Sequence, residues 1–237
     1  MNSANIVNYR WNALAAQSEL IKVALRIILT NATKSIQQRG EFHFVLSGGD
    51  TPREVYKQLS SINTDWSAWH IYFSDERCLL LGDQNLNSIM AEQAWLDHVP
   101  IPRNQLHVIP VELGVSRAAY EYARTLRSAE IFDLVFLGLG EDGHTASLFP
   151  GHEWGNVAGS PDTLAVFDAP KAPQHRVSMS AVRLSRSRQV VFLVSGNSKH
   201  LAVDKWRKGD NIPAQAITPI AGVDVLLESS LLVPLPT

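Results

Sequence analysis

The sequence predicts an α/β protein with a doubly wound, mostly parallel sheet and helices on both faces, a Rossmann-like single domain spanning residues 1–237. Three observations lead to this fold class. Strand patterns alternate with helix patterns along the chain. The run Phe132–Leu137 is apolar on both faces, as a buried parallel strand requires. The length suits one sizeable core, and no internal repeat or linker divides the chain.

In the first part of the chain, apolar residues at helical spacing predict a helix over Trp11–Gln38, which Gly40 ends. Phe42–Leu46 then reads as a strand that enters a glycine turn and a helix with Pro52 at its first position. Gly151–Pro173, rich in Gly, Pro and Asp, is expected to be a mostly long-loop segment. Further strands are expected at His70–Phe73, Leu164–Phe167, Arg176–Ser180, Val190–Val194 and Val223–Leu227, and further helices at Ser88–His98, Ser116–Ser128 and after Gly196.

The composition indicates an ordinary globular protein, with 45% hydrophobic and 19% charged residues. A net charge of −2 gives no general attraction to nucleic acid or to an anionic membrane. Cys78 is the only cysteine, which excludes a disulfide framework and favours a reducing compartment. Residues 1–5 lack the features of a secretory signal, and no apolar run approaches the roughly 20 residues that cross a bilayer. We therefore expect a cytoplasmic protein without nucleic-acid or membrane partners.

Positive charge is concentrated in one segment. Lys171–Lys208 holds nine Lys or Arg and a single acid, Asp204, whereas the rest of the chain holds twelve basic and twenty-two acidic residues. Such a segment suits a small anionic ligand, although most of these side chains are expected to be solvated surface residues.

The loop Ser47–Pro52 has the composition of a phosphate-binding turn. Paired glycines, Gly48 and Gly49, let the backbone approach a ligand, and the helix N-terminus adds partial positive charge. Asp50 is expected to cap the helix and point away from the anion. The loop lacks the Gly-Lys-Ser/Thr of a P-loop, which argues against ATP binding. By itself this turn is as often structural as functional.

Two further loops follow predicted strands. Ser74–Arg77 contains two acids and an arginine, a pattern that alone is more often a solvated surface cluster. Gly138–Gly151 is more specific, because His144 lies two residues after Asp142 in a glycine-rich loop. A histidine beside a carboxylate is typical of a general acid/base. Since ligands bind at the carboxyl ends of parallel strands, the three loops are expected to form one site.

Together these loops closely resemble those of the 6-phosphogluconolactonase family, and the resemblance covers nearly the whole chain. Further matches are Leu96–Pro102, Pro173–Arg176 and Gly196 with Lys199. The family shares its fold with glucosamine-6-phosphate deaminases. The resemblance implies hydrolysis of 6-phospho-D-glucono-1,5-lactone to 6-phosphogluconate in the oxidative pentose phosphate pathway, without a metal or organic cofactor.

The resemblance also implies roles for individual residues. His144 would be the general base that takes a proton from the attacking water. Asp142 would orient His144 or the water, and Asp75 would line the sugar pocket, with the closer carboxylate partner of His144 left open. Arg77 or amide groups of the loop would stabilise the negative charge that develops on the carbonyl oxygen.

The substrate phosphate would lie on the turn formed by Ser47, Gly48, Gly49 and Thr51. Arg176 and Lys199, both from the basic segment, would contact it. The chain departs from the family at Asp50, Leu80 and Leu86, where serine, proline and serine are common; none of these changes removes a proposed catalytic group.

Two alternatives stay open. A deaminase on the same fold typically carries a glutamate just after the histidine of the loop Gly138–Gly151 (the histidine loop), where this chain has Leu148-Phe149-Pro150. It also typically carries a tyrosine where this chain has Arg77. A sugar-phosphate sensor would lose the catalytic residues and carry a DNA-binding segment, for which there is no room before the first strand. The missing glutamate and the arginine at position 77 favour the lactonase over the deaminase, and the presence of Asp142 and His144 favours it over the sensor. The lactonase is expected to act as a monomer or homodimer on a small phosphorylated sugar lactone.

Overall fold

The computed structural model describes residues 8–233, so the expectation about a secretory signal falls on residues outside the described part. The main sheet has seven parallel strands in the order β1-β10-β9-β6-β2-β3-β5. The strands are β1 (Tyr9–Leu14), β2 (Phe42–Leu46), β3 (Trp69–Phe73), β5 (Leu106–His107), β6 (Leu134–Gly138), β9 (Val190–Val194) and β10 (Val223–Glu228). The expected fold class is confirmed.

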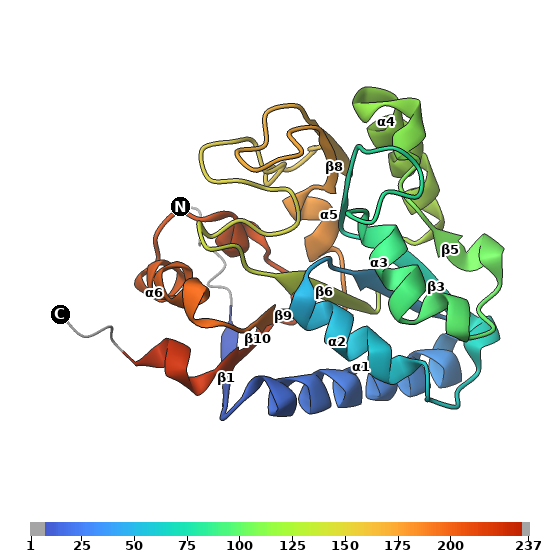
Figure 1. Cartoon of the computed structure of the whole chain (residues 1–237), viewed down its shortest axis with the longest axis horizontal. Helices are drawn as coiled ribbons and strands as arrows, with labels where there is room; N and C mark the ends of the chain where they lie inside the picture. Colours follow the sequence, from blue (N-terminus) through green and yellow to red (C-terminus); the bar gives the residue numbers. More distant parts are fainter. Residues whose placement is uncertain (1–7, 234–237) are drawn as a thin grey trace.

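Helices cover both faces of this sheet. The α-helices are α1 (Gln17–Arg39), α2 (Asp50–Leu59), α3 (Asn87–Ala94), α4 (Val115–Thr125), α5 (Ala181–Ser185) and α6 (His200–Lys208). Helices α1 and α2 run along one side of the sheet, and α4 and α5 lie on the opposite side (Figure 1). A sheet covered in this way must be apolar on both faces.

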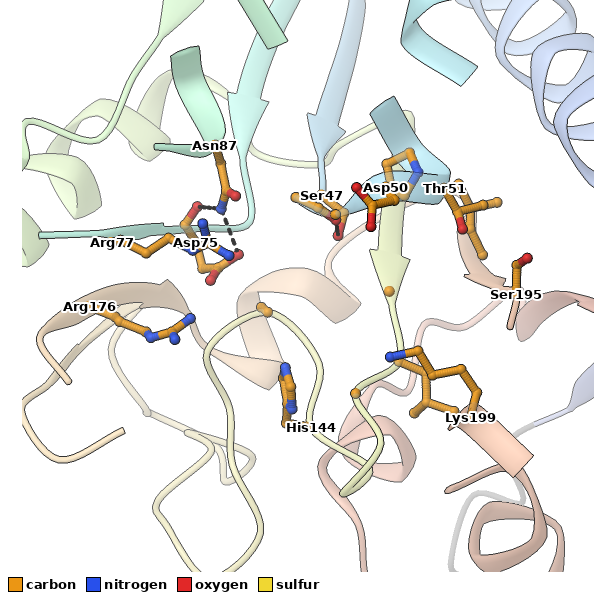
Figure 2. Close-up of a pocket in the computed structure, with 18 residues that line it drawn as sticks. Ser47, Asp50, Thr51, Asp75, Arg77, Asn87, His144, Arg176, Ser195 and Lys199 are labelled. Atoms are coloured by element: carbon orange, nitrogen blue, oxygen red, sulfur yellow. Dashed lines mark hydrogen bonds between the residues drawn. The ribbon is translucent and has the colours of Figure 1, made fainter. Parts of the chain in front are cut away.

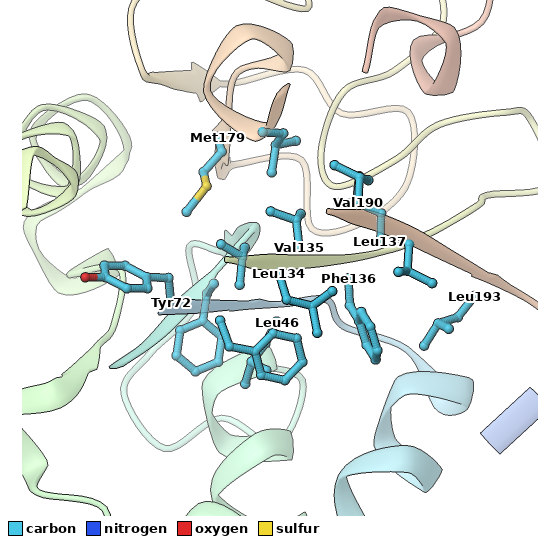
Figure 3. Close-up of a cluster of buried hydrophobic side chains, with 14 of the residues drawn as sticks. Leu46, Tyr72, Leu134, Val135, Phe136, Leu137, Met179, Val190 and Leu193 are labelled. Carbon is cyan, nitrogen blue, oxygen red and sulfur yellow. The ribbon is translucent and has the colours of Figure 1, made fainter. Parts of the chain in front are cut away.

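Strand β6 shows this burial most clearly. Leu134, Val135, Phe136 and Leu137 are all fully buried. Figure 3 shows Val135 on one side of the strand and Phe136 on the other, each among side chains from neighbouring strands. Alternate side chains of a strand point to opposite faces, so a strand between two helical layers needs apolar residues at every position. The sequence-based prediction of this strand is confirmed.

A second, smaller sheet was not expected. It has three antiparallel strands in the order β4-β8-β7, with β4 at Asp75–Arg77, β7 at Thr163–Val166 and β8 at Arg176–Met179. The sequence located β7 and β8 to within a residue but gave no sign that they leave the main sheet. The triplet Asp75–Arg77, expected as a loop, is a short strand because β8 supplies its hydrogen-bond partners.

The start of the chain differs from the prediction of one helix over Trp11–Gln38. Residues Tyr9–Leu14 form β1, which pairs in parallel with β10, and helix α1 begins only at Gln17. The rings of Tyr9 and Trp11 contact the indole of Trp206, with centroid distances of 5.4 and 5.3 Å. These contacts come from distant parts of the chain and override the local helical spacing.

Helix α2 also starts earlier than expected. Its N-cap is Gly49, with a φ of +105°, so Asp50 is the first helical residue and Pro52 the third rather than the first. The helices predicted at Ser88–His98 and Ser116–Ser128 end in short 3₁₀ turns at Leu96–His98 and Leu126–Ser128, and the helix predicted after Gly196 is α6, preceded by a 3₁₀ turn at Asn197–Lys199. The two-residue strand β5 and the single-turn helix α5 had no clear sequence signal.

No helix within residues 8–233 has the length and apolar character needed to cross a membrane.

Candidate active site

A pocket of about 290 Å³ opens at the carboxyl ends of the main-sheet strands. Successive strands lead away from β2 in both directions, to β3 and β5 on one side and to β6, β9 and β10 on the other. The loops that follow β2 and β6 therefore diverge at the switch point of the sheet, where such folds bind ligands. The lining residues come from these loops, from the loop after β9, from strands β4 and β8 and from the start of α3.

His144 lines this pocket and is paired with Asp142. The distance from His144 Nδ1 to Asp142 Oδ1 is 2.5 Å, and the backbone N–H of His144 donates to the same oxygen at 3.2 Å. The carboxylate accepts the proton of Nδ1 and thereby leaves Nε2 with a free lone pair. The sequence left open whether Asp142 or Asp75 partners the histidine, and the geometry favours Asp142.

The protonation states of this pair follow from its surroundings. Burial lowers the pKa of His144 below its ordinary value, and the adjacent carboxylate of Asp142 offsets only part of that effect. Burial by itself raises the pKa of Asp142, but the hydrogen bonds and charge of His144 outweigh it and hold this pKa below its usual range. A neutral imidazole beside an ionised carboxylate is the state that accepts a proton.

The loop around the pair is tightly folded. Gly140 N–H donates to the carbonyl of His144 at 2.7 Å, and Gly143 N–H donates to that of Gly140 at 3.0 Å. A methyl group at Gly140 would overlap the imidazole of His144 and lie 2.7 Å from Asp142 Oδ1. The ring of Phe149 packs against the imidazole with a centroid distance of 4.9 Å. Gly140 is required here because only hydrogen fits between the backbone and the pair.

The glycine turn after β2 lies on another wall of the pocket. Ser47, Gly48, Gly49 and Thr51 all line it, and helix α2 begins there without a side-chain cap. The first N–H groups of the helix are thus not taken by a capping side chain, which suits an anion. Asp50 does not cap the helix as expected; its carboxylate pairs with Arg53 at 3.0 Å and is mostly exposed.

The basic segment contributes to two sides of the pocket. Figure 2 shows Lys199 and Ser195 beside Thr51 on one side, and Arg176 on the opposite side with His144 between. Burial lowers the pKa of Lys199, and the carboxylates of Glu141 and Asp142 act against this. Lys199 thus stands as a partly buried cation near the N-terminus of α2.

Arg176 is held on the second sheet. It is the cross-strand neighbour of Arg77, and both line the pocket (Figure 2). Its Nε donates to the carbonyl of Pro173 at 2.9 Å and its Nη2 to that of Lys171 at 3.0 Å. The guanidinium also lies 5.5 Å from the ring centroid of Phe149. Two nitrogens of Arg176, Nε and Nη2, therefore hold its own loop, and the guanidinium also lines the pocket.

Asn87 and Ser195 are pocket residues that the sequence did not select as site residues. Asn87 Nδ2 donates to the carbonyl of Asp75 at 2.9 Å, and a methyl group at Gly48 would overlap the Asn87 carboxamide. Ser195 donates to Glu228, which also accepts from Gly196 N–H at 2.9 Å. Ser195 directly follows β9, so the rule that ligands bind at strand ends would have indicated it.

Glu76, the middle residue of the acidic triplet, does not line the pocket. It is buried and accepts backbone N–H bonds from Arg77, Asn87 and Ser88, each at 2.8 Å. Burial raises its pKa. Its role is to hold the start of helix α3 against β4. Among residues 8–233, no group of three or more His, Cys, Asp or Glu side chains is arranged to hold a metal ion.

A doubly wound sheet with a histidine–carboxylate pair in a pocket at its switch point defines the class as an α/β enzyme. Residues 15–226 match the family described as glucosamine-6-phosphate isomerases/6-phosphogluconolactonase. The chain belongs to this family.

Individual relatives agree with this assignment. A 6-phosphogluconolactonase from Synechocystis sp. is 37% identical over 193 residues, which cover 78% of this chain and 79% of the relative. A crystal structure of 6-phosphogluconolactonase from Thermotoga maritima superposes with a TM-score of 0.85 at 25% identity, covering 93% of this chain and 100% of that one. A monomeric glucosamine-6-phosphate deaminase shares the fold, with a TM-score of 0.81 at 20% identity over 94% of this chain and 98% of that one.

Proposed function

We propose that this protein hydrolyses 6-phospho-D-glucono-1,5-lactone to 6-phosphogluconate, the reaction of the oxidative pentose phosphate pathway. The observation that carries the proposal is the pairing of His144 Nδ1 with Asp142 Oδ1 at 2.5 Å inside a pocket with cationic side chains on both sides. His144 Nε2 takes a proton from water, and the water oxygen attacks the lactone carbonyl. When the tetrahedral intermediate collapses, the bond between the carbonyl carbon and the ring oxygen breaks, and the His144 imidazolium returns the proton to that oxygen, which becomes the C5 hydroxyl of the open-chain acid. Asp142 fixes the tautomer of His144 and stabilises the imidazolium that forms.

The oxyanion that forms on the carbonyl oxygen needs a donor or a cation nearby. Several N–H groups of the histidine loop are already engaged. Gly140 and Gly143 donate to loop carbonyls, His144 donates to Asp142, and Thr145 N–H donates to the carbonyl of Leu148 at 3.3 Å. Arg77 lines the pocket, and only its Nη1 is engaged, by the carbonyl of Asn85, while its Nε has no partner among the described residues; Arg77 is therefore the better of the two candidates that the sequence offered.

The phosphate of the substrate is proposed to lie on the turn Ser47–Thr51, at the N-terminus of α2. Lys199 supplies a point charge beside this turn, and Arg176 supplies a planar donor from the opposite side.

The proposal is tested by turnover of freshly prepared 6-phosphogluconolactone by the purified protein, measured as acid release above the spontaneous rate. Glucosamine 6-phosphate serves as the parallel substrate. The positions where deaminases typically carry a glutamate hold Leu148 and Phe149, both fully buried and apolar. We expect lactone hydrolysis and no ammonia release; ammonia release without hydrolysis would assign the chain to the deaminase reaction instead.

The pH dependence of kcat/KM follows from the state of His144. Because burial lowers the pKa of this imidazole below 6.5, the neutral, proton-accepting form persists into mildly acidic solution. Activity is therefore expected to fall on the acid side with a midpoint below 6.5. A pH–rate profile corrected for spontaneous hydrolysis measures this midpoint, and a midpoint well above that value would argue against His144 as the base.

The phosphate assignment predicts a substrate-selective defect. Removal of a charge-assisted hydrogen bond costs about 1.5–3 kcal/mol, so Lys199→Ala should raise KM for the phosphorylated lactone roughly tenfold to a hundredfold. The same change should have little effect on the much weaker hydrolysis of glucono-1,5-lactone. Arg176→Ala should show the same selectivity with an added loss of thermal stability, because Arg176 also holds the carbonyls of Lys171 and Pro173. Equal effects on both lactones would exclude a phosphate contact.

A further inference from the structure

Ser147 connects the histidine loop to the second sheet. Its hydroxyl donates to Asp75 Oδ2 at 2.6 Å, and its backbone N–H donates to Ser178 Oγ at 3.2 Å. Asp75 and Ser178 are directly opposite each other in the antiparallel pair of β4 and β8. All three residues are buried. The loop is therefore docked at two points onto one cross-strand pair.

The carboxylate of Asp75 is engaged on both oxygens. While Oδ2 accepts from Ser147, Oδ1 accepts from Ser74 Oγ at 3.2 Å and from Asn87 Nδ2 at 3.4 Å. The side chain is also near the guanidinium of Arg176. With hydrogen bonds to both oxygens from three different residues, the carboxylate is held in one position. Its contacts suit a fixed anchor.

The turn that contains Ser147 directly follows His144, so the position of Ser147 affects the position of the imidazole. Thr145 and Leu148 exchange backbone hydrogen bonds at 3.3 and 2.9 Å, and Ala146 between them has a φ of +48°. A positive φ at a non-glycine residue is held only when its surroundings define the conformation. The turn begins directly after His144, so a shift of Ser147 would also move the imidazole.

We propose that Ser147 and Asp75 form a positioning pair that sets the place of the His144 imidazole relative to the second sheet, where Arg77 and Arg176 line the pocket. This inference rests on the proposed function for its kinetic consequence. Asp75 then acts through the loop that it anchors, and Ser147 is a positioning residue that the sequence had not singled out.

The kinetic test is Ser147→Ala. Misplacement of a catalytic group by about 1 Å costs on the order of a hundredfold in rate, so kcat should fall roughly tenfold to a hundredfold. KM for the phosphorylated lactone should change less than about threefold, since the phosphate turn is untouched. Ser147→Thr, which keeps the hydroxyl, should recover most of kcat. A wild-type kcat in Ser147→Ala, or an equal loss in Ser147→Thr at unchanged thermal stability, would overturn the proposal.

A double-mutant comparison tests whether Ser147 affects kcat through its hydrogen bond to Asp75. If Ser147 acts through Asp75, the double variant Ser147→Ala/Asp75→Ala should have a kcat less than about twofold below that of Asp75→Ala alone. An undiminished loss in that background would show that Ser147 acts independently of Asp75. The matched control is Ser187→Ala: Ser187 is also buried, but its hydroxyl donates to the backbone carbonyl of Leu184, at 2.9 Å, and not to Asp75. It should leave kcat unchanged.

A measurement that needs no turnover separates this inference from the proposed function. The ¹⁵N resonances of the His144 imidazole, assigned by comparison with His144→Ala, should shift or broaden in Ser147→Ala and stay unchanged in Ser187→Ala. Unchanged resonances in Ser147→Ala would refute the positioning role even if the protein hydrolyses the lactone. Absence of lactone hydrolysis in the wild-type protein would refute the proposed function and leave this result to decide the positioning role.

Discussion

Replacement of His144 by alanine is expected to lower kcat/KM for 6-phosphogluconolactone by about 10²- to 10⁴-fold, the usual contribution of a positioned general base. The variant loses the imidazole that contacts Asp142 Oδ1 while keeping the cationic residues around the pocket. Binding of 6-phosphogluconate should therefore stay within a few-fold of wild type. Stopped-flow measurement of acid release, corrected for spontaneous hydrolysis, and calorimetric titration with product check the two halves of this prediction.

The control for this variant is His98→Ala. His98 is exposed and its Nε2 lies 3.0 Å from the carbonyl of Gln93, outside the pocket. It should retain full activity. Near-wild-type turnover by His144→Ala would remove the proposed mechanism, whereas loss of both turnover and product binding would indicate that the loop has collapsed and would call for the more conservative His144→Gln.

Gly140→Ala is expected to cause the second-largest loss, at least about a hundredfold in kcat, because misplacement of a catalytic group by about 1 Å costs that much. The added methyl group would lie 1.9 Å from His144 Nδ1 and 2.7 Å from Asp142 Oδ1, so it would overlap the imidazole. The pair must separate, or the loop must move. The backbone of Gly140 has no positive φ, so the defect arises from this overlap and not from backbone strain. Steady-state kinetics and thermal unfolding distinguish a displaced pair from an unfolded chain.

Gly138→Ala provides the steric comparison. A methyl group there would lie 3.7 Å from Ser47 Oγ, an ordinary van der Waals contact, so this variant should lose much less activity than Gly140→Ala. If the two variants behave alike, the loss reflects general sensitivity of the strand end, and the specific overlap with His144 is not its cause.

Much of the fold could be predicted because its strands carry their own signal. Strands β2, β6, β9 and β10 are short apolar runs, and burial on both faces makes every position informative. The failure at Tyr9–Leu14 has the opposite cause. That strand lies at the edge of the sheet and is only partly buried, so its pairing with β10 and its contacts with Trp206 decide its conformation.

Some residues of the candidate site could likewise be predicted from the sequence, and others could not. The loops with Gly48 and His144 could be selected because paired glycines and a histidine near a carboxylate each follow a predicted strand, and the structure brings them into one pocket. Asn87 and Ser147 could not be selected in this way, because asparagine and serine are common surface residues and only burial and a partner such as Asp75 distinguish these two. For Ser195 the sequence signal is its place directly after β9, and the structure adds its hydrogen bond to Glu228.

By itself, the sequence determined the fold class, the switch-point loops and the family, because each depends on local patterns or on motifs read in chain order. The tertiary structure decided which carboxylate partners His144 and how the loop is held. Asp142 is two residues away and within 2.5 Å, whereas Asp75 is joined to the loop only through Ser147. That distinction depends on the small antiparallel sheet, whose strands β4 and β8 are far apart in the chain. Pairing between distant segments is set by the packing of the whole domain, which no local pattern encodes.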